Sequence, residues 1–373
     1  MLTMTTLQTE FSEDELLATH PISEPLIAGG VRCHGGFDES GDYVSPRTLH
    51  RWPAIKAWQA QHHEQFGTDL VGLPLDAWPE HYPNVAQAAW LLENAVPEPI
   101  ITTLTRIGTV EGFGSMIRHT TIPPLERCFE EEVAGTTIAH LGRGLYEAHA
   151  RDEAGYEDEG GHRQMWFAAR DLAFENPVTE DETETMLVRM GVVRPGQSAI
   201  PDPAAARRMA AERRVLGEDM DFDLELLVER MARLLLIEIS AFHTFAWAEE
   251  LLADEHLVAG EGDGARLISY VRADEETHVE YLKTALSEMR DRTWIGTSGR
   301  RYEGTDMVRV IWERSLKESL GVRREQTLAV TLGEVEFALG GHRRRDDVLE
   351  GFHLRGSIRP GPDGEWMPVP VEH

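Results

Sequence analysis

One long helical pattern constrains the fold of this chain most, because it places a charge among apolar side chains. Residues 221–256 contain few helix-breaking residues and repeat apolar side chains at the spacing of an α-helix. Glu238 lies within that stripe, whose other members are Met231, Leu234, Leu235, Ala241, Phe242 and Phe245. An ionised carboxylate is costly to bury among such side chains unless it is paired or bound to a metal ion. The pattern therefore predicts a buried helix whose charge has a partner.

The next helical pattern carries a carboxylate and a histidine together. Its apolar stripe contains Leu267, Ile268, Val271, Glu275, His278, Val279 and Leu282. Glu275 and His278 are three residues apart, so on a helix both side chains project from one face and can reach one metal ion. An earlier segment, Asp158-Glu159-Gly-Gly-His162, repeats the arrangement of Asp274-Glu275-Glu-Thr-His278. The two segments predict two Glu-x-x-His pairs.

A second lone carboxylate is expected on the helix before the first of these pairs. Residues 124–141 have the composition of that helix, and its apolar arc contains Leu125, Cys128, Phe129, Thr136 and Ala139. At 100° per residue Glu132 falls inside this arc and Glu131 lies at its edge. We therefore expect Glu132 as the ligand, with Glu131 as the alternative.

The six residues together resemble the ligand set of the ferritin-like di-metal carboxylate family. That family has a four-helix bundle with one Glu from each of two helices and Glu-x-x-His from each of the other two. The matching residues here are Glu132, Glu159, His162, Glu238, Glu275 and His278. Four carboxylates balance the charge of two divalent cations, and oxygen-rich coordination with one imidazole per metal suits iron or manganese. The resemblance implies two iron ions, with manganese or a mixed pair as alternatives.

Two aspartates beside these ligands fit the resemblance, whereas two glycines depart from it. Asp158 and Asp274 each precede a ligand Glu, and the resemblance implies that they accept the N–H of a ligand histidine from the facing helix. The glycines between Glu159 and His162 depart from the family pattern, because each weakens a helix by about 1 kcal/mol. They signal either irregular helicity or the close approach of substrate or of a neighbouring helix.

The predicted architecture is all-α, with a ferritin-like four-helix bundle at residues 120–290 and additional N- and C-terminal helices. Residues 1–119 should form an irregular arm followed by accessory helices, and residues 291–373 should form further helices and a Pro/Gly-rich tail. Residues 191–203 are expected to be a linker inside the bundle. Sustained alternation of apolar and polar residues, the pattern of half-buried strands, is almost absent.

Charge and cysteine content exclude several other classes of protein. The net charge of −29 argues against binding to nucleic acid or to an anionic membrane surface, because phosphate contacts need a basic face. Two cysteines cannot form a disulfide framework or a four-cysteine metal site. The chain shows neither a signal peptide nor an apolar run of membrane-spanning length, so we expect a cytoplasmic protein.

The resemblance implies a non-haem di-iron oxidoreductase that uses O₂ to oxidise a small, mostly apolar organic substrate, as hydroxylases, oxygenases and oxidases do. No catalytic residue beyond the metal ligands is expected. Trp166, Phe242, Phe245 and Val271 lie near the ligands and are expected to line the substrate pocket. A reductase or ferredoxin is an expected electron donor, and a homodimer is compatible with the sequence.

Two alternative functions use the same ligand set. The first is a ferritin-like protein that binds or oxidises iron without an organic substrate. The second is a radical protein like the small subunit of ribonucleotide reductase, in which a tyrosine follows the first Glu-x-x-His by about one turn. Trp166 occupies that position here, four residues after His162, which argues against the radical protein.

Overall fold

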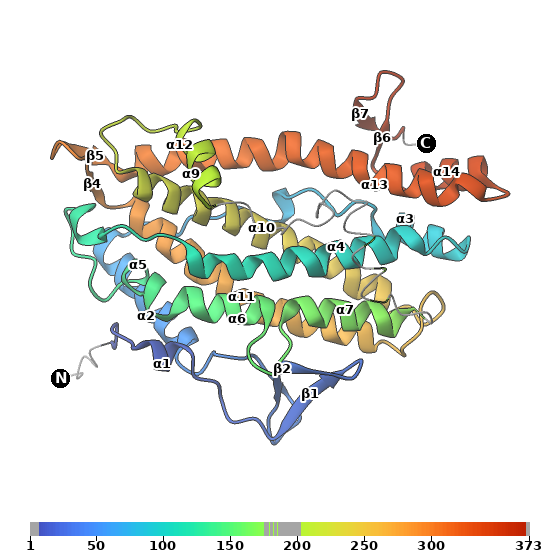
Figure 1. Ribbon diagram of the computed structural model, residues 1–373, viewed down its shortest axis with the longest axis horizontal. Helices are drawn as coiled ribbons and strands as arrows, with labels where there is room; N and C mark the ends of the chain where they lie inside the picture. The colour runs from blue at the N-terminus through green and yellow to red at the C-terminus, as the bar shows by residue number, and fades with distance from the viewer. Residues whose placement is uncertain (1–6, 175–178, 180–181, 183–184, 186–202, 371–373) are drawn as a thin grey trace.

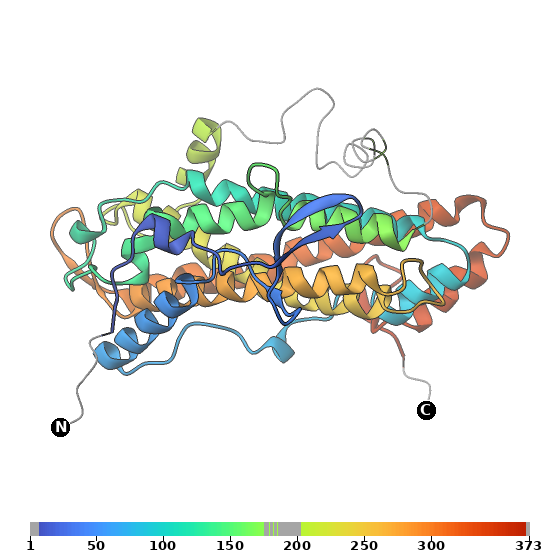
Figure 2. The ribbon, with the colours of Figure 1, turned by 90° about the horizontal axis from the view of Figure 1, so that it is seen from below.

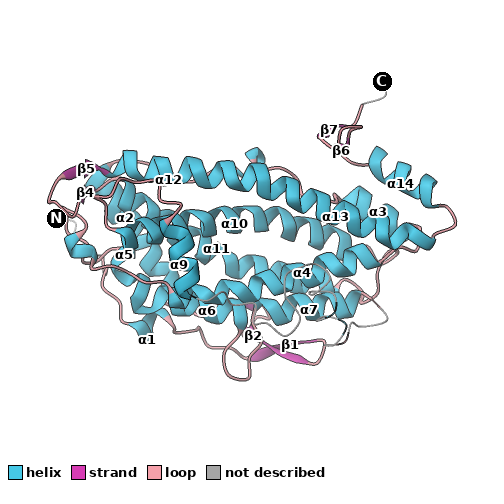
Figure 3. Cartoon of the chain, turned by 45° about the horizontal axis from the view of Figure 1, so that its top comes forward, coloured by secondary structure: helices cyan, strands magenta, loops and turns pink. Residues whose placement is uncertain are grey.

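The two longest helices lie where the sequence predicts them. The computed structural model describes residues 7–174, 179, 182, 185 and 203–370, and this part of the chain is mostly helical (Figure 3). Helix α10 (Phe222–Leu252) packs along α11 (Asp263–Arg290), as Figure 1 shows. Asp221 caps α10 by accepting hydrogen bonds from two backbone N–H groups of its first turn, which fixes where that helix begins.

A third layer beside these helices consists of α4 (Glu98–Gly114), α6 (Tyr146–Ala154) and α7 (His162–Ala173). Helices α6 and α7 lie end to end and run beside α4 (Figure 1). The glycines of α4 permit this close packing. A Cβ atom on Gly108 would lie 2.8 Å from Phe167 and 2.9 Å from Trp166 of α7.

The helix expected over residues 145–176 is interrupted between α6 and α7. Gly155 ends α6 with a positive φ of 83°, and Gly161 precedes the first residue of α7. A Cβ on Gly161 would lie 2.4 Å from the carbonyl oxygen of Asp152, so the two helix ends meet too closely for a side chain. Residues 155–161 therefore loop out of an otherwise continuous helical line.

The N-terminal region is not the irregular arm that the sequence predicts. It contains α1 (Glu13–Leu16) and an antiparallel sheet of β1 (Glu24–Ala28), β2 (Val31–Phe37) and β3 (Tyr43–Val44), in the order β1-β2-β3. The sheet lies against α7 (Figure 2), and β2 exchanges two backbone hydrogen bonds of 2.8 Å with Gly160. Four consecutive residues of β2 are buried, so this strand lacks the alternation by which half-buried strands are recognised. Helix α2 (Arg51–Phe66) then packs on α11.

The helix expected at residues 124–141 does not form. Only two short turns occur there, η3 (Leu125–Arg127) and α5 (Thr137–His140), and a π-type turn, η4 (Leu141–Leu145), leads into α6. Between them Phe129 forms a β-bridge with Trp294, and Gly135 has a positive φ of 66°. The angular positions calculated for a continuous helix therefore do not apply to this segment.

The remaining elements surround this core. The chain between β3 and η3 contains α2 and α4 together with η1 (Leu75–Ala77), α3 (Val85–Glu93) and η2 (Ser115–His119). Helix α9 (Pro203–Ala211) follows the expected linker, of which residues 191–202 lie outside the described part. The C-terminal elements are β4 (Thr293–Ile295), β5 (Arg301–Glu303), α12 (Gly304–Glu318), η5 (Ser319–Arg323), α13 (Arg324–Ala338), η6 (Leu339–Gly341), α14 (Arg345–Leu354), β6 (Ile358–Pro360) and β7 (Trp366–Pro368). The tail thus forms a β6–β7 hairpin.

Two apolar clusters fill the interior, and they divide α10 and α11 at corresponding places. On α10 one cluster ends at Ile239 and the other begins at Phe245. On α11 one ends at Val271 and the other begins at Tyr281. Glu238 directly precedes the first of these limits on α10, and Glu275 and His278 lie between the two limits on α11. In the described chain no helix combines the length and apolarity needed to cross a membrane.

Replacing Gly108 by alanine should lower the free energy of unfolding by about 1–3 kcal/mol, because the added methyl group has no room between α4 and α7. Gly333→Ala on α13 is the matched control. Its Cβ would meet no atom within 4 Å, so it should raise the free energy of unfolding by about 0.5–1 kcal/mol. Urea denaturation measures both, and equal effects would contradict the described packing.

Candidate metal centre

Buried acidic and histidine side chains from five helices converge between the two apolar clusters. The converging residues are Glu111 of α4, His149 and Glu153 of α6, His162 of α7, Glu238 of α10, and Glu275 and His278 of α11. Their potential ligand atoms form two groups, and within each group these atoms lie within 4.8 Å of one another. Such spacing allows each group to surround one metal ion.

The first group is centred on His162. Its Nδ1 lies 2.8 Å from Oε1 of Glu275, 3.6 Å from Oε2 of Glu111 and 3.8 Å from Oε2 of Glu153. The imidazole and the Glu275 carboxylate are at most 1% exposed, and the Glu111 side chain is 11% exposed. One nitrogen and three carboxylate oxygens thus face a common point.

The second group uses the other oxygens of the same central carboxylates. Nδ1 of His278 lies 2.5 Å from Oε2 of Glu275 and 3.5 Å from Oε1 of Glu153. Nε2 of His149 lies 3.4 Å from that Glu153 oxygen and 3.8 Å from Oε1 of Glu238. Glu153 and Glu275 therefore each direct one oxygen to either group, which is the placement of carboxylates that bridge two metal ions.

Asp152 and Asp274 orient the two histidines reciprocally. Asp152 precedes Glu153 on α6 and accepts a hydrogen bond of 2.9 Å from Nε2 of His278 on α11. Asp274 precedes Glu275 on α11 and lies 3.5 Å from Nε2 of His162 on α7. A carboxylate that accepts from Nε2–H leaves the Nδ1 lone pair of a neutral imidazole directed at the cluster.

The N-terminal region holds both aspartates in place. His34 of β2 and Tyr43 of β3 contact Asp274 at 3.0 and 2.9 Å. Arg47 and Arg51 each contact Asp152 at 2.7 Å. Burial opposes ionisation of Asp152, but these two guanidinium groups outweigh it and hold its pKa well below the ordinary value. The sheet and the start of α2 therefore form part of the site.

Several buried polar atoms at the cluster lack a hydrogen-bond partner. One of them is Nε2 of His162, which lies 3.5 Å from Asp274. The other four are Nε2 of His149, Oε2 of Glu153, Nδ1 of His162 and Oε1 of Glu275. Unsatisfied buried polar atoms are rare in native proteins and need an explanation. All four belong to the two groups described above, so bound cations would supply the missing partners. The donor set, oxygen with imidazole nitrogen, fits iron or manganese.

Without cations the four carboxylates cannot all be ionised at neutral pH. Burial raises the pKa of Glu111 to about 7 and that of Glu153 to about 8, and the charge of Glu275 adds to both. Burial and the same charge raise the pKa of Glu238 well above its ordinary value. Burial acts on Glu275 too, but the positive charge of His278 outweighs it and holds that pKa well below the ordinary range.

Four of the six ligands expected from the sequence lie in this cluster, namely His162, Glu238, Glu275 and His278. Glu159 does not. It lies in the loop at 155–161, where Arg32 of β2 pairs with it at 3.3 Å and with Asp158 at 3.2 Å. The side chain of Asp158 is 74% exposed, so it contacts no cluster histidine.

The preceding Asp-Glu dipeptide occupies the positions predicted for Asp158 and Glu159. The sequence contains Asp152-Glu153 six residues before Asp158-Glu159. Because Glu159 precedes His162 by three residues, the sequence favoured Asp158-Glu159, whereas the structure places Asp152-Glu153 at the cluster. That spacing has meaning only on a continuous helix. Gly155 ends the helix between the two dipeptides, and Gly160 and Gly161 separate the second dipeptide from α7. His162, the first residue of α7, nevertheless lies beside Glu153, with its Nδ1 3.8 Å from Oε2 of that residue.

Glu132 is also placed away from the cluster. It is exposed in the irregular segment before α5, and its carbonyl oxygen accepts a hydrogen bond from Arg292. The alternative, Glu131, binds the backbone and hydroxyl of Thr293. Glu111 of α4 lies in the cluster instead. The sequence could have indicated that Glu111 is buried, because Glu111 extends an apolar helical stripe formed by Ile100, Leu104, Ile107 and Gly108.

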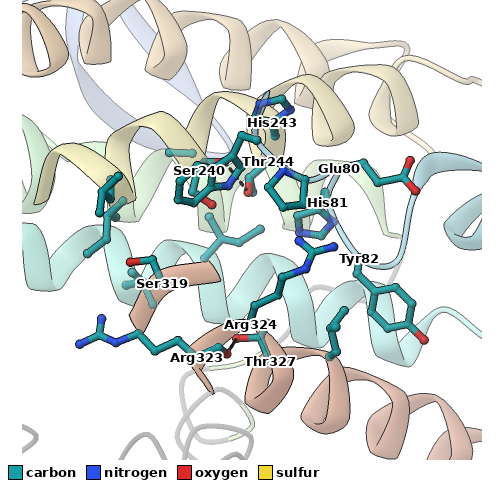
Figure 4. Close-up of a pocket in the computed structure, with 18 of the residues that line it drawn as sticks. Glu80, His81, Tyr82, Ser240, His243, Thr244, Ser319, Arg323, Arg324 and Thr327 are labelled. Carbon is teal, nitrogen blue, oxygen red and sulfur yellow. Dashed lines mark hydrogen bonds between the residues drawn. The ribbon is translucent and has the colours of Figure 1, made fainter. Parts of the chain in front are cut away.

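A cavity of about 370 Å³ reaches this cluster, because Glu111 forms part of its wall. It lies between α4, α10, the η5–α13 junction and residues 78–82 (Figure 4). The four residues predicted to line a pocket are not among its lining residues. Trp166, Phe245 and Val271 are fully buried in the apolar cluster, and Phe242 is partly exposed elsewhere. The described cavity is therefore not the pocket that these four residues predict.

Comparisons of the chain with models of protein families, with curated proteins and with solved structures find no significant match. The resemblance to ferritin-like proteins therefore gains no support from similarity and stays a prediction. What the chain can do has to be inferred from the geometry of the cluster and of the cavity beside it.

The metal-free protein should lose stability as the pH rises from about 4.5 to about 8. Glu111 and Glu153 have folded-state pKa values of about 7 and about 8, above the ordinary value of 4.5. In that interval the unfolded chain has released protons that the folded chain retains, so a rise in pH favours unfolding.

Urea unfolding of the chelator-treated protein at pH 5.5 and pH 8 measures this loss. Glu153→Gln removes one of the two titrations, so its stability should fall less between the same pH values. Stability that is constant or increases from pH 5.5 to 8 would contradict the described burial of these carboxylates.

Proposed function

We propose that the cluster binds two divalent metal ions, iron or manganese, and that the protein is an O₂-dependent oxidoreductase. One observation carries the proposal. Glu153 and Glu275 each direct one carboxylate oxygen toward His162 and the other toward His278. A single-metal site would not need both oxygens of both carboxylates. On this proposal α4, the α6–α7 line, α10 and α11 correspond to the helices of a ferritin-like bundle.

The charges of the cluster support two cations rather than one. Four buried carboxylates, those of Glu111, Glu153, Glu238 and Glu275, carry −4 when ionised. Two divalent ions carry +4 and bring the site to neutrality, whereas a single ion would leave two buried negative charges. Asp152 pairs separately with Arg47 and Arg51, so it is not counted with these four carboxylates.

The residues around the cluster would keep a bound pair of metal ions oriented and dry. Two adjacent ferrous ions supply electrons for the reduction of O₂. Asp152 and Asp274 hold the two imidazoles with Nδ1 inward, and Leu235, Ile239 and the other residues of the two apolar clusters exclude water from either end. The protein would therefore contribute ligand geometry and a site of low polarity.

An organic substrate is favoured because Glu111 belongs to both the cluster and the cavity wall. A molecule in the cavity would meet the carboxylate of a metal ligand directly. The cavity volume of about 370 Å³ lies within the range of small-molecule sites. This connection favours oxidation of an organic molecule over the iron-binding alternative, for which such a cavity has no evident use. A reductase or ferredoxin would deliver electrons.

The radical-protein alternative has weaker support. It expects a tyrosine one turn after the first ligand histidine, and Trp166 is at that position. Its ring packs against Phe245 with centroids 5.6 Å apart, inside the apolar cluster. We therefore keep the oxidoreductase as the proposed function.

Measuring the metal content of variants in the two neighbouring Asp-Glu dipeptides tests which of them supplies a metal ligand. Protein reconstituted anaerobically with ferrous ion should contain about two metal ions per chain by elemental analysis. Glu153→Ala should lower this number, because it removes a carboxylate shared by both groups. Glu159→Ala is the matched control and should not change it, since Glu159 pairs only with Arg32. Equal metal content in the two variants would contradict the assignment.

Filling the cavity tests the use of an organic substrate. Ferrous-loaded protein should consume O₂ faster with a suitable member of a panel of apolar acids, aldehydes and arylamines. Ala241→Trp places an indole in the cavity and should abolish this acceleration, while oxidation of the bound ferrous ions by O₂ persists. Val330→Trp, on the exposed surface of α13, is the control. Oxidation indifferent to every compound would favour the iron-binding alternative.

A further inference from the structure

We propose that the ligand of this cavity is an organic monocarboxylate, whose carboxylate group binds Arg324 and whose apolar body extends toward Glu111. That the ligand is a substrate rests on the proposed function, but its recognition by Arg324 does not. The inference follows from the charges that face the cavity and from the positions of the two residues on their helices.

Arg324 is a partly buried cation at the wall of the cavity. It opens α13, and Figure 4 shows its guanidinium group directed toward His81 inside the cavity. Within the described part of the chain it makes no hydrogen bond or ion pair. Its surroundings also disfavour the charge, since burial lowers the pKa of Arg324. A guanidinium group held in this way is suited to bind a carboxylate through two parallel hydrogen bonds.

The other arginines at the cavity are already engaged or directed elsewhere. Nη1 of Arg106 donates to both carboxylate oxygens of Glu334, at 3.0 and 3.1 Å, so its charge is balanced. Arg323 is exposed and points away from Arg324 in Figure 4. Glu80 is the carboxylate whose charge acts on Arg324, but it is exposed and accepts a hydrogen bond from Ser357. Arg324 is therefore left for the ligand.

The site offers one positive charge rather than two. His81 faces Arg324, but burial lowers the pKa of His81 to about 4, so it is neutral at pH 7. Its Nδ1 lies 3.0 Å from the carbonyl oxygen of Pro83, which can only accept a hydrogen bond. A single guanidinium group matches a carboxylate, which carries one negative charge, better than a phosphate monoester, which carries nearly two.

Helix geometry places Arg324 and Glu111 at similar heights on α13 and α4, which both line the cavity. Arg106 of α4 contacts Thr331 of α13, and the two helices run in opposite directions (Figure 1). Glu111 lies five residues beyond Arg106, about 7.5 Å along α4, and Arg324 lies seven residues before Thr331, about 10.5 Å in the same direction.

The wall between Arg324 and Glu111 is largely apolar. It includes Ile107, Val110, Leu236, Ile237, Leu320 and Leu328. Val110 and Ile237 are exposed by 46% and 44%, so their side chains are accessible to a ligand in the cavity. An apolar body attached to the carboxylate would cover this wall and reach Glu111.

Calorimetric binding of octanoate and of octanamide, its uncharged counterpart, tests the inference in metal-free and in manganese-loaded protein. The protein should bind octanoate at least about tenfold more tightly than octanamide in both forms. Arg324→Gln should remove this preference and leave octanamide binding unchanged, which also shows that the variant is folded. Arg324→Lys should retain part of the preference. Arg309→Gln, on the exposed face of α12, removes an equal charge and should have no effect.

Three results would overturn the inference. The first is equal affinity for octanoate and octanamide, and the second is a preference for octanoate that survives Arg324→Gln. The third is octyl phosphate binding about tenfold more tightly than octanoate. Octanoate could also bind only to the metal-loaded protein, with an affinity that Arg324→Gln does not change. That outcome counts as the second result, because the carboxylate would then bind the metal rather than Arg324. Failure of metal binding would leave the metal-free measurement intact, so the two proposals can fail separately.

Discussion

Four carboxylates buried within a few ångström of one another are the constraint on which the rest of this structure depends. Glu153 and Glu275 lie at the centre of the helical core, where repulsion and the loss of water both oppose their charges. The described chain contains too few nearby cations to balance the set. Arg47 and Arg51 are occupied by Asp152, and His162 and His278 supply at most two positive charges against four carboxylates. Bound divalent ions, as proposed, would resolve the constraint. The apolar clusters on either side then isolate the charged centre from water.

The N-terminal region makes sense as part of this centre. Strand β2 supplies His34 to Asp274, and the same strand pairs with Gly160 of the loop that separates α6 from α7. The loop brings His162 to the cluster although the preceding helix, α6, ends at Ala154, directly after Glu153. One segment of chain therefore fixes the loop and one of the aspartates that orient the histidines. Residues on the other side of α4 face the cavity, so the cluster lies between a rigid support and a ligand site.

The sequence predicted the helices of this centre better than it predicted the ligands. Glu238, Glu275 and His278 could be found because each lies on a long unbroken helix, where periodicity reports which side chains are buried. Glu153 was missed because a loop separates it from His162, so the two residues do not have the i, i+3 spacing of a continuous helix. Spacing alone does not reveal that the chain leaves a helix and then continues along the same axis. His149 lies four residues before Glu153 and could be recognised only after Glu153 was placed. The roles of the N-terminal residues depend on contacts across more than a hundred residues, for which one sequence gives no signal.

The most direct test of the account is a crystal structure of the iron-loaded protein with anomalous diffraction recorded at the iron absorption edge. Two peaks separated by about 3.5–4 Å are expected, one beside Nδ1 of His162 and the other beside Nδ1 of His278. Glu153 and Glu275 should lie between the two peaks. The absence of iron from the cluster, or a single peak between His34 and Asp274, would contradict the proposed two-metal centre.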